Sequence, residues 1–550
     1  MKGKKISLIV FAVAVTSLLA FTTPADRYFD IAKSLDIFAT LIKEVNANYV
    51  DEIDPKKIID ISINGMLQQL DPYTVYIPKE DMESFSIQTT GEYAGIGALV
   101  GLINKKTVVT NPYVGFPAQR GGIRVGDELV SINGKNVEGA NTNESSALLK
   151  GAPQTEVEVE VKRYGEPNTL KFKLMREKIK ISNVTYSGLI EKDLGYIKLD
   201  EFTPGAGREV AEAVTKLKSQ GATKLILDLR DNPGGSLYEA VNIVNIFIPK
   251  GKEVVSTKGK SQESNKTYNT LNNPVDLEIP LAVLTSGGSA SASEIVSGSL
   301  QDYDRAVLVG QRTFGKGLVQ TTRDLSYDAQ LKVTTAKYYI PSGRCIQALD
   351  YEHRHSDGSV TKFPDSLKRE FKTKIGRKVY DGAGLDPDVN VSTEEVAPIT
   401  VELVASGLVF EYASKYCGEH KTISQTMRTF RLSDDEYNKF SEWLRTQSFT
   451  FTPEVERKVD ALIASAKNEK YYDQLQSPLT DLKNKITQSR SSDLVRFKSE
   501  ITRILEDEIS FHYQLAQGQT EVDLDRDQEI IEAKKLLSDL SRYHQLLSVQ

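Results

Sequence analysis

The chain has 550 residues, of which 39% are hydrophobic and 26% charged, and its formal net charge is −6. A chain of this length exceeds one ordinary core, so several domains are expected. Acidic and basic residues are interspersed, which argues against a nucleic-acid-binding protein, because such proteins usually carry a basic face. The two cysteines, Cys345 and Cys417, lie far apart in sequence and predict neither a metal cluster nor an obligatory disulfide.

The N-terminus has the layout of an export signal. Three lysines within the first five residues precede an apolar run from Ile6 to Phe21. The run is short for a membrane-spanning helix, which needs ~20 apolar residues, and Leu19-Ala20-Phe21 fits a cleavage site poorly. We expect an uncleaved signal anchor over residues 1–24, with a cleaved signal peptide as the alternative. Either reading places the rest of the chain outside the cytoplasm.

Helical and β-type patterns follow one another in the first third of the chain. Apolar residues recur at three-to-four spacing from Asp26 to Val50, and a second helix is predicted over Ile58–Leu70, so residues 25–90 should form a small helical domain. The apolar stripe is either core or a dimer surface, and we favour core. Residues 91–184 show short β-type runs with glycine punctuation, and Asn133-Gly134 is a strong hairpin signal.

The remainder of the chain has two further regions. Residues 185–395 alternate strands and helices, which predicts a parallel or mixed α/β layer fold. Residues 396–550 are polar and helical, and the charged segment Glu521–Glu532 is expected to be a solvated linker or helix end. The fold class is therefore an α+β multidomain protein.

Three glycine-rich turns follow predicted strands in the α/β region. The carboxyl ends of strands are where sites form in open α/β sheets, so these turns place a serine, a lysine and backbone amides at one sheet edge. The strands are Lys224–Arg230, Leu281–Thr285 and Arg305–Gly310; the turns are Asp231–Gly235, Ser286–Ser291 and Thr313–Gly317; and a helix from about Ala292 to Gln301 follows the second turn.

The serine and the lysine suit nucleophilic catalysis. Ser291 would need a base beside it, and the five histidines all lie outside the glycine-rich turns, which leaves Lys316. Its pKa would have to fall from ~10.4 to near 7, which burial can achieve. The oxyanion would need preorganised donors, for which the amides of Gly234 or Gly235 and of Ala292 are candidates.

Simpler interpretations exist for each segment alone. Ser291–Glu294 is a Ser-x-x-Glu capping box, which would by itself explain the serine. Neither the phosphate-binding loop pattern nor the Gly-x-Ser-x-Gly elbow is satisfied. His353-Arg354-His355 could bind a metal, but we expect a charged surface loop, and we predict no metal site and no cofactor.

Taken together, these segments closely resemble the signature of the carboxyl-terminal processing peptidases, also called tail-specific proteases. The resemblance covers roughly residues 25–395 and implies a crotonase-like peptidase core over residues 185–395. It implies that Ser291 is the nucleophile, Lys316 the base and Gln320 the residue that orients the lysine, while Asp302 matches an acidic position near the site in some members. The segments that carry it are Gly288–Ile295, Arg305–Gly310, Thr313–Gln320 and Asp228–Gly235, and further matches are Leu70–Thr74, Tyr339–Gln347 and Gly384–Asp388.

The same resemblance implies a PDZ domain over residues 91–184. Tyr93–Ala98 looks like the carboxylate-binding loop, and Gly115–Asp127 looks like the helix-and-turn segment. Exposed amides around Gly95, Ile96 and Gly97 can capture a terminal carboxylate while the peptide adds a strand to the sheet edge. The alternative is that these glycines only make turns.

The resemblance implies a serine endopeptidase that cleaves exported proteins near their C-termini. We expect protein or peptide substrates bound by their C-terminus, PDZ gating of the site, membrane attachment through the N-terminal segment, a homodimer and a periplasmic location. Two rivals remain: an inactive PDZ scaffold on the same fold, and an acyl-thioester enzyme on a crotonase-like core.

Overall fold

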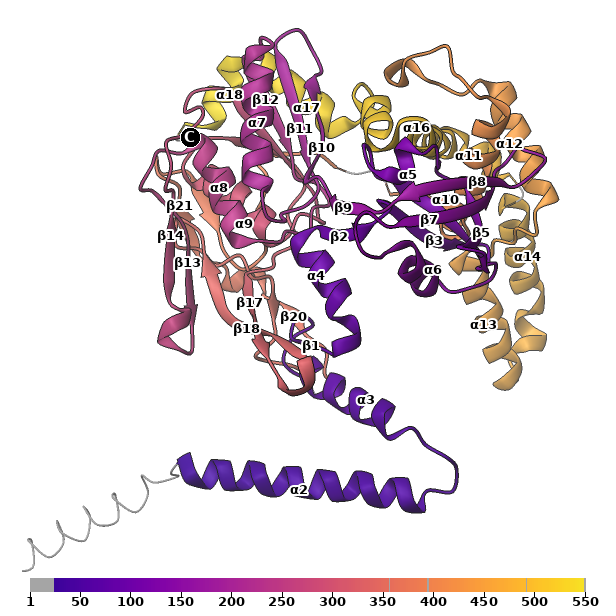
Figure 1. Cartoon of the computed structure of the whole chain (residues 1–550), viewed down its shortest axis with the longest axis horizontal. Helices are drawn as coiled ribbons and strands as arrows, with labels where there is room; N and C mark the ends of the chain where they lie inside the picture. The colour runs from indigo at the N-terminus through magenta and orange to yellow at the C-terminus, as the bar shows by residue number, and fades with distance from the viewer. Residues whose placement is uncertain (1–23, 356, 393–394, 491, 549–550) are drawn as a thin grey trace, which may run out of the picture. The chain divides into compact units, whose positions relative to one another are not determined.

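The computed structural model describes residues 24–355, 357–392, 395–490 and 492–548 (Figure 1). The signal segment expected over residues 1–24 lies outside this range apart from Pro24. No helix within the described ranges is long and apolar enough to cross a membrane. The chain divides into two units: one holds the residues up to Tyr76 together with Thr322–Val333, and the other holds Ile77–Thr321 and the chain from Thr334 onward.

The first unit contains the two helices that the sequence predicts. They are α2 (Pro24–Asn48) and α3 (Pro55–Gln68), and α3 begins after Asp54, whose side chain accepts the Lys56 and Lys57 N–H groups. The expectation that the stripe on α2 is core is wrong for the single chain. Leu35 is 62% exposed, so the apolar residues of this helix have too few neighbours within the chain to cover them.

The β domain of the second unit is a six-stranded antiparallel sheet in the order β3-β4-β5-β7-β8, with β6 beside β5. Asn133 and Gly134 both have positive φ, 50° and 75°, in the turn between β5 and β6, so the predicted hairpin is confirmed. The six strands of this sheet are β3 (Ala98–Ile103), β4 (Lys106–Pro112), β5 (Glu128–Ile132), β6 (Lys135–Asn136), β7 (Glu156–Lys162) and β8 (Leu170–Met175). A separate two-stranded antiparallel sheet pairs β2 (Glu92–Gly95) with β9 (Glu177–Lys180), and the helices are α5 (Pro117–Arg120) and α6 (Thr142–Leu149).

A second six-stranded sheet forms the α/β region, in the order β10-β11-β12-β15-β16-β23. Only the β10–β11 pair is antiparallel, and the four remaining pairs are parallel. The predicted mixed α/β layer is thereby confirmed. The strands are β10 (Val184–Leu189), β11 (Leu194–Leu199), β12 (Lys224–Asp228), β15 (Leu281–Thr285), β16 (Val307–Gly310) and β23 (Val389–Asn390).

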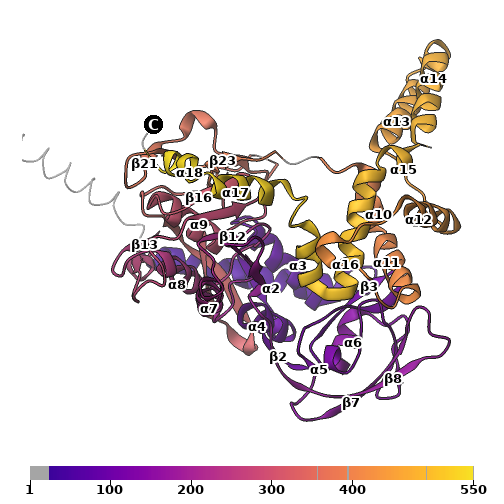
Figure 2. The same ribbon diagram turned by 90° about the horizontal axis from the view of Figure 1, so that it is seen from above.

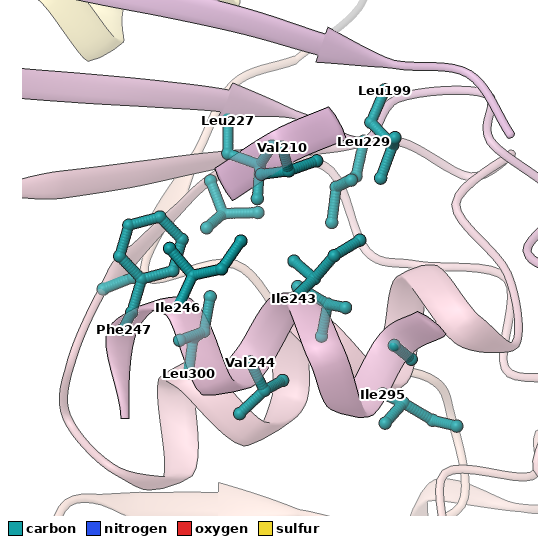
Figure 3. Close-up of a cluster of buried hydrophobic side chains, with 14 of the residues drawn as sticks. Leu199, Val210, Leu227, Leu229, Ile243, Val244, Ile246, Phe247, Ile295 and Leu300 are labelled. Atoms are coloured by element: carbon teal, nitrogen blue, oxygen red, sulfur yellow. The ribbon is translucent and has the colours of Figure 1, made fainter. Parts of the chain in front are cut away.

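Helices cover both faces of this sheet. On one face lie α7 (Ala206–Ser219), α8 (Leu237–Phe247) and α9 (Ala292–Asp302), whose apolar side chains pack on strand residues such as Leu199 and Leu227 (Figure 3). On the other face lie α17 (Gln528–Ser538) and α18 (Leu540–Leu546) (Figure 2). These two helices pack on alternate residues of the same strands, including Ile226 and Leu284. Alternation of side chains along a strand supplies both sets.

Beyond residue 396 the chain is helical, as predicted. The helices of this region are α10 (Pro398–Ala405), α11 (Leu408–Glu419), α12 (Asp434–Thr446), α13 (Glu454–Asn468), α14 (Tyr472–Arg490), α15 (Asp493–Arg496) and α16 (Lys498–Asp523). A separate apolar core, which includes Tyr412, Phe440, Leu505 and Ile509, joins α10, α11, α12 and α16, and no described residue of α13 or α14 belongs to it.

Of the two alternatives for Glu521–Glu532, the helix end is confirmed and the solvated linker is wrong, since α16 ends at Asp523 and α17 begins at Gln528. Val522, Leu524 and Ile530 are buried, and Asp527 is the N-cap of α17. Asp527 and Glu529 pair with Arg230 of the α/β region, and Arg526 pairs with Glu506 and Asp507 of α16. Composition alone does not reveal these partners.

Candidate active site

The three glycine-rich turns lie where the sequence places them. β12, β15 and β16 are neighbouring parallel strands, so the turns that follow them share the carboxyl edge of the sheet. Ser291 is the N-cap of α9, directly after the turn that leaves β15, with φ 55° and ψ −111°. A positive φ at a residue other than glycine costs roughly 1–3 kcal/mol, and such strain concentrates at functional sites.

Three serine hydroxyls connect this turn to the turn after β12. Ser289 Oγ donates to the Leu229 carbonyl at 2.7 Å, and Ser286 Oγ donates to Asp231 Oδ1 at 2.9 Å. Ser293 Oγ donates to the Asn232 carbonyl at 2.9 Å. These bonds, two of them fully buried, fix the position of Ser291 relative to the Asp231–Gly235 turn.

The two glycines proposed for the oxyanion site differ in their hydrogen bonds. Gly234 has φ 94°, and a Cβ there would come within 2.7 Å of Ala290 O and Ala292 N, so this backbone lies against the start of α9. The Gly234 N–H already donates to Asn232 Oδ1 at 2.9 Å. Among the backbone hydrogen bonds of the described residues, Gly235 and Ala292 donate none. The geometry therefore favours Gly235 over Gly234 as the second donor.

Glu294 ties the serine to the lysine turn. Its Oε2 accepts the Ser291 N–H and the Lys316 N–H, each at 2.9 Å. Its Oε1 accepts the Gly315 N–H at 2.7 Å and the Thr313 hydroxyl at 2.6 Å. Sequence reasoning identified Glu294 only as a helix cap, because the Ser-x-x-Glu spacing reveals the local bond and not the bonds to a turn nineteen or more residues away.

Complete burial governs the electrostatics of Glu294. Burial raises the pKa of this carboxyl, and the hydrogen bonds from Thr313, Lys316, Gly315 and Ser291 oppose that rise. Four donors fill both oxygens, which is the coordination that an ionised carboxylate prefers.

The lysine turn is closely packed on its other side. Gly315 has φ 87°, and a Cβ there would lie 2.4 Å from the Cβ of Ala348. The Gly317 N–H donates to Gln347 Oε1 at 2.8 Å, and the Gly317 carbonyl accepts the Tyr338 N–H at 2.9 Å. The Lys316 side chain is half-buried, so the turn presents it at the sheet edge on a fixed backbone.

Gln320 and Asp302 lie in different surroundings. Gln320, on β17 (Leu318–Asp324), donates from Nε2 to Thr334 Oγ1 at 3.1 Å on the neighbouring strand β18 (Gln330–Tyr339). Asp302 is the last residue of α9 and pairs with Arg344 at 2.7 Å. Since Ser291 is at the other end of this helix, Asp302 lies roughly 16 Å from it and holds Arg344 rather than the site.

The loop proposed to bind a carboxylate joins β2 and β3. Ile96 is buried, and its carbonyl accepts the Ala118 N–H at 2.8 Å, while the Gly97 carbonyl accepts the Tyr113 N–H at 2.9 Å. Gly97 has φ 74°, and a Cβ there would lie 2.4 Å from Phe116 Cβ. The carbonyls of Ile96 and Gly97 are thus tied inward. His353 and His355, by contrast, are exposed as expected for a surface loop.

Four family models match the chain. Peptidase family S41 matches residues 193–353, a PDZ domain matches 108–163, the C-terminal helical domain of probable PDZ-proteases matches 399–537, and the N-terminal domain of the activating protease CtpB matches 24–81. The α+β multidomain architecture, with a PDZ domain between helical ends, is therefore shown.

Several proteins with protease names are similar to the chain in sequence. A carboxy-terminal-processing protease of Bartonella bacilliformis is 37% identical over 347 residues, which cover 62% of this chain and 77% of that protein. A probable CtpA-like serine protease of Staphylococcus aureus is 40% identical over 344 residues, which cover 61% of this chain and 68% of that protein. A solved photosystem II D1 C-terminal processing protease is 28% identical, with a TM-score of 0.34 over 64% of this chain and 92% of that one. On the sequence matches, the chain belongs to peptidase family S41, as a serine-type peptidase of the carboxy-terminal-processing kind.

Proposed function

We propose that the chain is an endopeptidase in which Ser291 and Lys316 form the catalytic pair. The observation that carries the proposal is the shared oxygen of Glu294, which brings the backbone of both residues to one buried atom. The strained φ of Ser291 at a strand-to-helix turn supports it, because such turns expose a nucleophile.

In the proposed reaction, neutral Lys316 accepts the Ser291 hydroxyl proton while Oγ attacks the scissile carbonyl carbon. The tetrahedral oxyanion accepts hydrogen bonds from the N–H groups of Ala292 and Gly235. These donors are already in place, so the backbone need not rearrange. The Lys316 ammonium returns the proton to the leaving amine. Water then hydrolyses the acyl-enzyme, with Lys316 acting again as base.

Gln320 is proposed to orient Lys316. Its amide nitrogen is engaged with Thr334, which leaves Oε1 as the atom that can accept from a lysine ammonium. Such an acceptor would select one rotamer of the flexible lysine side chain and hold it toward Ser291.

We further propose that the PDZ domain binds substrate C-termini and gates the site. With the carbonyls of Ile96 and Gly97 tied inward, the amides of Gly95, Ile96 and Gly97 can face a terminal carboxylate. Exported substrates, membrane attachment through residues 1–24, a periplasmic location and a homodimer belong to the same proposal. So do the domain boundaries at residues 25, 91, 185 and 396, which the matched ranges support.

Cleavage of an unfolded model protein with an apolar C-terminus tests this function. Wild type should cut it, while Ser291→Ala and Lys316→Ala should be folded and inactive. The matched controls are Ser219→Ala and Lys216→Ala on the exposed face of α7, which should cut like wild type. Activity that survives in Ser291→Ala would place the nucleophile elsewhere, and an inactive wild type would favour the scaffold.

A further inference from the structure

The start of α17 makes a charged contact with the flank of the oxyanion turn. Arg230 immediately precedes Asp231–Gly235, and its Nη1 donates to Asp527 Oδ2 at 2.7 Å and to Glu529 Oε2 at 3.2 Å. Its Nη2 donates to Asp228 Oδ2 at 2.6 Å. The guanidinium therefore joins the end of β12 to the C-terminal segment of the chain.

Glu529 also reaches the strand end that leads to the lysine turn. Its Oε1 accepts Gln311 Nε2 at 3.1 Å. Gln311 follows β16 directly and is fixed to β15 by its N–H, which donates to the Thr285 carbonyl at 2.8 Å. One carboxylate thus connects the flanks of two turns, one oxygen to each.

These groups are shielded from water. The side chains of Arg230, Asp527 and Glu529 are 16%, 11% and 12% exposed. Burial raises the pKa of the Glu529 carboxyl, while the Arg230 charge opposes that rise. Removal of one partner from a buried ionic group leaves the remaining charges uncompensated. Loss of any one of these side chains should therefore destabilise the contact.

The helix that carries these acids is itself held firmly. Asp527 caps it by accepting the Ile530 N–H at 2.9 Å. Ile530, Ala533, Leu536 and Leu537 are buried against the sheet face that includes β12, β15 and β16. α17 is therefore packed firmly on the sheet whose strands lead into the two turns.

We propose that Glu529, with Asp527, is a positioning residue that sets the spacing between the oxyanion turn and the lysine turn. The proposal rests on the proposed Ser291–Lys316 chemistry. It makes the C-terminal segment 525–547 a component of the active site's framework. Loss of the Glu529 bridge displaces Gly235 and Lys316 relative to each other and lowers the rate of the chemical step.

The test compares Glu529→Gln and Glu529→Ala with Glu532→Gln in the full chain. Glu532 lies on the same helix and pairs with Arg542 at 2.8 Å, so its variant makes the same charge change away from the turns. We expect kcat to fall about 10-fold or more for the Glu529 variants, because displacement of about 1 Å can cost up to ~100-fold. KM should stay within about twofold, since substrate-binding groups are unchanged. Glu532→Gln should retain kcat.

Gln311→Met removes the hydrogen bond between Gln311 and Glu529 from its other side. It should lower kcat in the same direction, and combining it with Glu529→Ala should add little, because both remove one connection. All rates are taken well below each variant's Tm, so that unfolding does not contribute. Unchanged kcat in every Glu529 variant, with only a lower Tm, would overturn the proposal. A wrong catalytic assignment would be seen in a different variant, because Ser291→Ala would then remain active.

Discussion

The Glu294 carboxylate accepts the backbone N–H of Lys316 at 2.9 Å, twenty-two residues further along the chain. The same oxygen accepts the Ser291 N–H, so one buried side chain sets the backbone positions of the proposed nucleophile and base. The active-site geometry therefore depends on a residue that takes no part in proton transfer.

Glu294→Gln should damage both stability and activity. The amide group replaces one acceptor oxygen with a donor, so two of the four donors lose their acceptor. At ~1–3 kcal/mol for each unmet buried donor, the free energy of unfolding should fall by about 2–6 kcal/mol. Urea unfolding measures this, with the exposed Glu263→Gln as control. The same stability for both variants would contradict the four-bond arrangement.

Gly234→Ala should strongly lower kcat. Its φ of 94° disfavours alanine, and the new Cβ would come within 2.7 Å of backbone atoms at the start of α9. Either the oxyanion turn or Ser291 must move, so kcat should fall by at least ~100-fold. The control is Gly287→Ala in the serine turn, where a Cβ meets nothing within 4 Å. Steady-state kinetics that show equal losses for the two variants would refute the argument.

The PDZ loop should recognise a free carboxylate. A peptide with an apolar free C-terminus should bind at least ~10-fold more tightly than its C-terminal amide, because the amide lacks the charge that the loop amides would meet. Gly97→Ala should remove this preference, since its Cβ would clash with Phe116. Fluorescence anisotropy measures both affinities. Equal binding of acid and amide by wild type would argue against carboxylate capture.

His512 should make stability depend on pH. It is completely buried, its Nε2 faces Ser414 Oγ at 3.0 Å, and burial lowers its pKa from 6.5 to about 4. Because the folded pKa is depressed, its contribution is present above pH 6.5 and is lost as the pH falls toward 4. Burial raises the pKa of the neighbouring Glu508 to about 7, which acts in the opposite direction, since that contribution is lost as the pH rises through 7.

Comparison of wild type with His512→Asn isolates the histidine. The difference in their free energies of unfolding should grow by about 3 kcal/mol between pH 4 and pH 7, at ~1.4 kcal/mol per pKa unit. Chemical denaturation at several pH values measures it, with the exposed His355→Asn as control. A difference that stays flat across this range would show that His512 is not held neutral by burial.

The sequence predicts those features that depend on local pattern. The strand Leu281–Thr285 matches β15 residue for residue, and the helix after Ser291 differs by one residue at its end. The positions of Ser291 and Lys316 at one sheet edge follow from neighbouring parallel strands, which alternating strand and helix patterns indicate.

Contacts between distant segments could not be predicted in this way. The Ser-x-x-Glu spacing shows a cap, but not that Glu294 also binds the turn at Gly315 and Lys316. The charged segment Glu521–Glu532 has the composition of a solvated linker, yet Asp527 and Glu529 meet Arg230 some three hundred residues earlier. Composition reports charge, whereas the partner of that charge is set by the tertiary fold.

The most direct test of the central claim is to map the acyl-enzyme. Wild type is mixed with an acylating serine reagent, the reaction is quenched in acid, and the modified peptide is identified by mass spectrometry. If Ser291 and Lys316 are the catalytic pair, one adduct should form on Ser291, none in Ser291→Ala, and formation should be much slower in Lys316→Ala and Glu294→Gln. An adduct on another residue, or one that forms undiminished in Ser291→Ala, would contradict this assignment.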